Sequence, residues 1–187
     1  MLPRPTPPAF PQTAGGSNKQ RVVFELVRAR TQLMAALQGL SAGSGEERLG
    51  EGKWSVRETV LHLVTRDRAR LREMEAALLG RRGSWIGQGE AANAEMNERD
   101  LAPLRQHDWD QTLRLLQTTR QQLMEAIEAV PDEPGHVWET SHPFGEMLLK
   151  LPPHDRHHAE VLKRWRSSNG AEVRPATARA PSRKEKT

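Results

Sequence analysis

The sequence predicts an all-α protein, a four-helix bundle with an extra short helix before the third long helix. Along four long segments, apolar residues recur every three or four positions, which is the pattern of amphipathic helices. The chain has no alternating runs of β-branched residues and no Asn-Gly hairpin between such runs, so strands are not expected. Four amphipathic helices joined by loops bury their apolar faces against one another as a bundle.

The helical pattern covers residues 18–168, and the two ends of the chain differ from it in composition. Residues 1–17 hold five prolines and predict a disordered leader, and residues 169–187 predict a disordered basic tail. The formal net charge is +4, of which the tail carries +3 (five cations, two anions) and the leader +1. The domain between them is therefore neutral overall, which argues against a specific nucleic-acid partner.

The first two long helices have clear local signals. The first is expected over residues 18–38. The second is expected over residues 55–80 and begins with Ser55-Val-Arg-Glu58, a capping box in which each side chain accepts a hydrogen bond from a backbone amide at the helix start. Trp54 precedes this cap, where its ring can pack on the first turn.

Prolines delimit the next two helices. A shorter helix is expected over residues 89–101, followed by Pro103. The third long helix is expected over residues 108–130, with Asp108 as its N-cap and Pro131 as its end.

The last helix is expected over residues 144–166, but Pro152 and Pro153 interrupt it. Proline lacks an amide donor, clashes with the preceding turn and disfavours helix at the residue before it. We therefore expect a kink or break, with a new helix starting near Pro152. Such a break could shift His154 relative to His158.

Two histidines occupy inward positions of this last helix. His154 and His158 lie one turn apart where the neighbouring stripe positions are apolar. Such a pair can place two imidazole nitrogens on one metal ion. A pair of hydrogen-bonded core histidines would give the same pattern, so both interpretations stay open, and His157 could replace His158 as the partner. A third ligand would be needed, and His62 is a candidate, although its place on the flank of its helix is typical of a surface or boundary residue.

Three stretches of the chain resemble signatures of the DinB-like superfamily. The start of the second helix, WSVRETVLHL, matches a pattern of Trp-Ser/Thr, a short acidic stretch and His-Leu. The last helix, HDRHHAEVLKRW, matches a pattern with two histidines four positions apart, and residues 93–99 resemble the short Asn-containing helix of the family. The resemblance covers roughly residues 20–168.

The resemblance implies a four-helix bundle that holds a divalent metal ion, often zinc or nickel, with three histidines. It assigns these ligands to His62, His154 and His158. It also implies frequent dimers, and characterised relatives include bacillithiol- and mycothiol-dependent S-transferases and a mycothiol-dependent isomerase.

Metal chemistry suggests what such a site could do. Three neutral imidazoles leave open positions on a zinc or nickel ion, where a water can become a hydroxide and a thiol a thiolate. The chain has no cysteine, so the thiol would come from a low-molecular-weight cofactor. We expect a metal-dependent thiol S-transferase acting on small electrophiles, with a metal-dependent hydrolase and a non-enzymatic, stress-related binding module with a structural or vestigial metal site as alternatives.

No separate general base stands out in the sequence. Glu58 is committed to its capping box, and Asp67 and Glu73 are expected on the helix surface. Asp155 or Glu160 could accept the second N–H of an imidazole ligand, or both could be ordinary surface charges.

The expected partners are a second copy of the chain, in a homodimer, and a small-molecule substrate or thiol. No apolar run approaches the length of a membrane span, and the chain starts with no basic and apolar secretory signal. We therefore expect a cytoplasmic protein with no membrane partner.

Overall fold

The computed structural model describes residues 17–83 and 89–169, a part of the chain that consists of helices and their connecting loops. Within that part, the only β-pairing is an isolated bridge between Arg48 and Ser55, and no helix is both long and apolar enough to cross a membrane. The predicted leader and tail lie outside the described residues. The helices are α1 (Asn18–Leu37), α2 (Ala42–Glu46), α3 (Val56–Leu78), α4 (Glu90–Leu101), α5 (Trp109–Glu128), α6 (Pro143–Leu149) and α7 (Leu151–Asn169), with short 3-10 turns η1 (Ala102–Leu104) and η2 (Gly135–Trp138).

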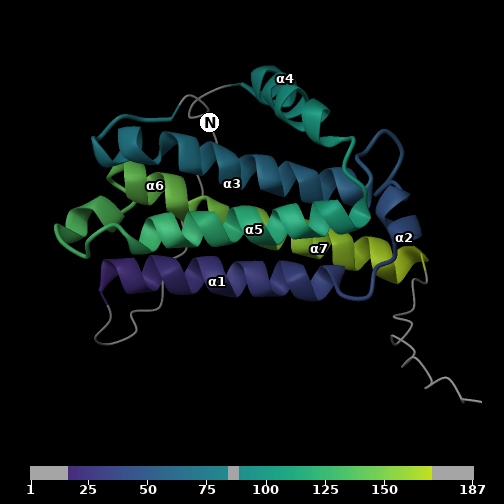
Figure 1. The fold of residues 1–187 in the computed structure, drawn as a ribbon, viewed down its shortest axis with the longest axis horizontal. Coiled ribbons are helices and arrows are strands. Elements are labelled where there is room, and N and C mark those ends of the chain that lie inside the picture. The colour runs from purple at the N-terminus through teal and green to yellow at the C-terminus, as the bar shows by residue number, and fades with distance from the viewer. Residues whose placement is uncertain (1–16, 84–88, 170–187) are drawn as a thin grey trace, which may run out of the picture.

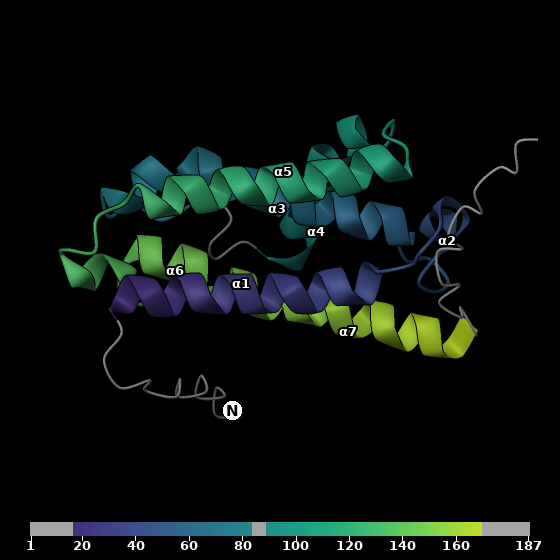
Figure 2. The same cartoon turned by 60° about the horizontal axis from the view of Figure 1, so that its bottom comes forward.

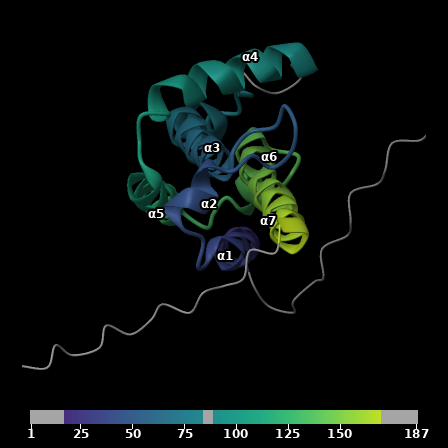
Figure 3. The ribbon, with the colours of Figure 1, turned by 90° about the vertical axis from the view of Figure 1, so that its right-hand side faces the viewer.

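The long helices form the predicted bundle, with α6 and α7 together taking the place of a fourth helix. α1 packs along α7, and α3 packs along α5 (Figures 1 and 2). The predicted short helix is α4, which lies on the outer side of α3 (Figure 3). The all-α four-helix prediction is therefore confirmed, and α3 is covered on more sides than a typical bundle helix.

Capping interactions start the long helices where the sequence indicates. Ser55 accepts a hydrogen bond from the amide of Glu58, and Glu58 accepts one from the amide of Ser55, which is the predicted capping box. Asp108 and Gln111 form the same arrangement at the start of α5. Each such cap is worth about 1 kcal/mol of helix stability, so these starts are set by residues within one turn.

The last helix is divided, as Pro152 and Pro153 predict. α6 ends at Leu149 and α7 begins at Leu151, so the expected break, with a new helix starting near Pro152, is confirmed. Both prolines lie in the first turn of α7, where a backbone amide has no helical acceptor to lose. The break precedes His154, and the spacing of the histidines within α7 stays helical.

Two apolar clusters make up the core. One gathers around the first half of α3, and includes Leu33, Val60, Leu116 and Leu162. The other lies toward α6, and includes Leu26, Leu123, Phe144 and Leu148. Four buried charged residues, Arg30, Asp67, Arg120 and Asp155, fall between the two clusters along their respective helices.

Candidate metal centre

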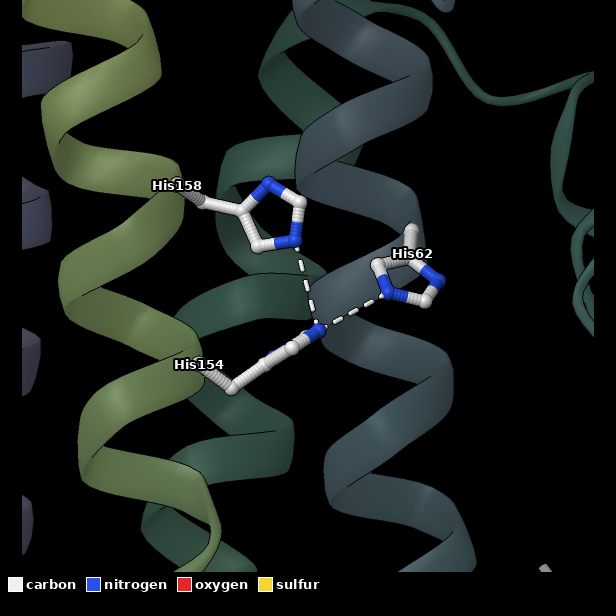
Figure 4. Close-up of side chains that lie close together, drawn as sticks. All are labelled: His62, His154 and His158. Carbon is white, nitrogen blue, oxygen red and sulfur yellow. Dashed lines mark hydrogen bonds between the residues drawn. The ribbon is translucent and has the colours of Figure 1, made fainter. Parts of the chain in front are cut away.

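Three histidines meet between α3 and α7 (Figure 4). The Nε2 atom of His154 lies 3.1 Å from Nε2 of His62 and 3.3 Å from Nε2 of His158. One ring nitrogen from each residue can be chosen so that all three lie within 4.8 Å of one another. The residues that the sequence pointed to are thus together in space.

Two different features of the fold bring them together. His154 and His158 share a face of α7 because they are four residues apart. His62 comes from α3, 92 positions away from His154 in the chain, and is only 4% exposed. Its flank position suggested a surface or boundary residue, and this is wrong because residues on nearly every side of α3 from 59 to 67 are buried.

Burial keeps the three imidazoles neutral. It lowers the pKa of His62 to about 2, with smaller contributions from His158 and from the cations Arg66 and Arg70. Burial also lowers the pKa of His158 to about 4, and it lowers the pKa of His154 still further. At neutral pH all three rings therefore carry free lone pairs, the form in which histidine binds metals.

The donor set fits a divalent ion. Each neutral imidazole carries one proton on its two nitrogens, and the Nε2 atom of His154 faces two other Nε2 atoms at once. A cation in the middle would accept the three lone pairs together, and three imidazoles are a ligand set of catalytic zinc sites. Within residues 17–83 and 89–169, the Nδ1 atoms of His62 and His154 are buried without a hydrogen-bond partner.

The other histidines stay outside the cluster. His157 is exposed, and its ring packs against that of His158, so His158 is the partner of His154 in the cluster. His107 contacts the carbonyl oxygen of Leu104, and His142 accepts a hydrogen bond from an amide in the first turn of α6. These contacts are structural, since they hold a loop and a helix start in place.

An aromatic ring flanks the cluster. The ring centroids of Trp54 and His62 lie 4.8 Å apart. Trp54, expected to pack on the first turn of its helix, is partly buried against the apolar cluster at this end of the bundle. Its contact with His62, two turns into α3, restricts the orientation of that imidazole.

A buried network of charges crosses the bundle next to the histidines. It contains Arg30 from α1, Asp67 from α3, Arg120 from α5 and Asp155 from α7. Asp67 accepts hydrogen bonds from Arg30 (3.1 Å) and from Arg120 (2.9 and 2.7 Å). Asp155 accepts from Arg30 (3.0 and 3.3 Å) and from Arg120 (3.1 Å). The two carboxylates and two guanidiniums join all four long helices at the level of His154.

This network corrects two expectations. Asp67 is not a surface residue but fully buried, and Asp155 is fully buried and accepts hydrogen bonds from Arg30 and Arg120. Glu160 is exposed and pairs with Lys163, so it is an ordinary surface charge. The sequence contains a signal for these buried charges, because Arg30, Arg120 and Asp155 occupy positions in the apolar stripes of their helices.

The chain thus combines an all-α helical bundle with a buried cluster of three histidines. Residues 25–162 match the DinB superfamily, and the chain belongs to that family. No curated protein sequence matches the chain significantly.

Solved structures share the fold at low sequence identity. An uncharacterised protein from Escherichia coli UTI89 is 15% identical, with a TM-score of 0.68 over 84% of this chain and 98% of that one. The colibactin self-resistance protein ClbS, solved in complex with double-stranded DNA, is 16% identical, with a TM-score of 0.67 over 82% and 98% of the two chains. YfiT from Bacillus subtilis, described as a probable metal-dependent hydrolase with an unusual four-helix bundle topology, is 15% identical, with a TM-score of 0.59 over 90% and 94%. These similarities establish the fold, and the expectation of no specific nucleic-acid partner stays a prediction.

Proposed function

We propose that the chain binds one divalent metal ion, zinc or nickel, through His62, His154 and His158. The observation that carries this proposal is the convergence of three neutral imidazoles on one point between α3 and α7. A structural relative, YfiT, is described as a probable metal-dependent hydrolase, which agrees with a metal role for this fold.

We propose further that the site transfers a low-molecular-weight thiol to small electrophiles. A bound ion would act as a Lewis acid that lowers the pKa of a thiol or water ligand. Among the described residues, the cluster contains histidines only, and the buried carboxylates Asp67 and Asp155 are taken up by arginines. The absence of a base within this cluster favours a nucleophile that is already ionised, and a thiol ionises more readily than water.

Metal-dependent hydrolysis is the second candidate, and the description of YfiT favours it. It would require a proton acceptor for the attacking water, for example one supplied by the substrate. A metal-binding protein that turns over neither thiols nor hydrolysable substrates would be the non-enzymatic binding module.

The test begins with metal content, measured by elemental analysis of untagged protein. We expect about one zinc or nickel ion per chain in the wild type and in His157→Ala, a matched control on the exposed side of α7. His62→Ala and His158→Ala should lose the ion. The metal-loaded protein is then assayed with bacillithiol or mycothiol and monochlorobimane, against ester hydrolysis in the absence of thiol. Full metal occupancy in both variants would refute the ligand assignment, and thiol-independent hydrolysis alone would favour the second candidate.

We also propose a cytoplasmic homodimer. Phe24 and Val27 lie one turn apart on α1 and are 61% and 51% exposed, an apolar pair that a second copy could cover. Large apolar side chains that are exposed together often mark interaction surfaces.

A further inference from the structure

We propose that Arg66 and Arg70 bind an anionic group of the substrate, a carboxylate or a phosphate, beside the three-histidine cluster. The inference deepens the proposed function, because it takes the cluster as the reaction centre. His62, Arg66 and Arg70 follow one another at four-residue intervals on α3. They therefore share one face of the helix, and each of the three lies about 6 Å along the helix axis from the next.

Both arginines are buried, which is unusual for cations. Arg66 is 8% exposed and Arg70 is 4% exposed. Burial lowers the pKa of Arg70 to about 10, so its guanidinium stays protonated at neutral pH, and burial also lowers the pKa of Arg66. Their positive charge lowers the pKa values of His62 and His154, which places the guanidiniums within electrostatic range of the histidines.

Only part of the guanidinium of Arg66 is hydrogen-bonded. Its Nη2 atom donates to Oδ2 of Asp100 at 3.2 Å, while its Nε atom is buried and finds no hydrogen-bond partner among the residues that the structure describes. Asp100 is shared, because it also accepts from Arg99 on the surface of α4. A buried polar group without a partner is costly, and an oxyanion in contact with Nε would satisfy it.

The charges around these arginines favour an anion. The carboxylates that act on Arg66 are Asp100 and Glu73, and the cations Arg72 and Arg99 act against them. Asp67 also acts on Arg70, but its oxygens accept hydrogen bonds from the cross-bundle network. Among the described residues outside that network, Arg66, Arg70 and the cations that act on them number four, against two carboxylates, and a divalent ion bound at the histidines would add to this positive excess.

Guanidinium chemistry suits this role. Its planar donors match the oxygens of carboxylates and phosphates, and it is more weakly hydrated than an ammonium group. The row of His62, Arg66 and Arg70 would hold the anionic group of a small molecule one to two helical turns from the reacting atom. The substrate class is thus an electrophile with a carboxylate or phosphate group a few bonds from its reactive centre.

The test is calorimetric titration of the purified protein with two probes, inorganic phosphate and succinate. We expect at least one probe to bind the wild type, and the tighter one identifies the anionic group. Arg66→Gln and Arg70→Gln should weaken binding at least tenfold. Arg114→Gln, an exposed arginine on α5 that does not act on either buried arginine, should bind within twofold of the wild type. Arg66→Lys, which retains the charge but loses the planar donors, covers the case in which Arg66→Gln does not fold, and it should also weaken binding.

The metal-free variant His154→Ala separates this proposal from the metal proposal. Anion binding that persists in His154→Ala and depends on Arg66 supports the arginine site even if no metal is found. Binding that disappears in His154→Ala but is unchanged in Arg66→Gln would show that the anion binds the metal, and would overturn the arginine site. No binding of either probe to wild-type protein, with or without zinc, would overturn it as well.

Discussion

Asp67→Ala tests whether the cross-bundle network is held by its ion pairs. Asp67 is fully buried and accepts three hydrogen bonds, one from Arg30 and two from Arg120. Its removal leaves two buried guanidiniums to share Asp155. Breaking a buried ion pair from one side costs about 3–5 kcal/mol, because the remaining charge is uncompensated. A domain of this size has a total stability of about 5–15 kcal/mol, so the loss is a large fraction of it.

The assay is urea unfolding followed by circular dichroism at 222 nm. We expect the midpoint to fall with an unchanged slope, and the melting temperature to drop by roughly 6–20 °C. Asp132→Ala is the matched control, because Asp132 is half exposed and its oxygen lies 4.0 Å from Nζ of Lys19. A surface pair of that kind contributes about 0–1 kcal/mol. A loss in Asp67→Ala no larger than in this control would refute the pairing that the structure shows.

Three further predictions concern the histidines and the surface. His154→Ala should lose the metal while its melting curve stays cooperative, and His157→Ala should retain the metal. Elemental analysis measures both, and full metal occupancy in His154→Ala would contradict the ligand assignment. The pKa values of His62 (about 2) and His158 (about 4) lie below the 6.5 of an ordinary histidine, so the unfolded chain binds more protons in this range. Metal-free protein should therefore lose stability as pH falls from about 6.5 toward 4, by up to about 1.4 kcal/mol per pH unit for each histidine; urea midpoints at pH 7 and pH 5 measure this, and the triple His→Asn variant should show a smaller change. Phe24→Glu should convert the proposed homodimer to a monomer in light scattering, and a wild type that is monomeric at high concentration would refute the proposed dimer.

Local sequence determined the helix boundaries. The capping box of Ser55 and Glu58 and the prolines Pro152 and Pro153 act within one or two turns, so their effect does not depend on the rest of the fold. The pairing of His154 and His158 is local in the same sense, because the helical repeat alone places them on one face.

The third histidine and the buried charges depended on tertiary structure. His62 joins the cluster only because α3 packs beside α7, a contact between distant segments that no helical wheel contains. Asp67 and Arg120 are charged residues of types that usually lie on the surface. Each is tolerated in the interior only because a partner from another helix neutralises it. The sequence by itself determined where the long helices begin and end and which two histidines share a face. The packing of those helices decided which side chains meet, because burial and charge pairing are properties of contacts between distant segments.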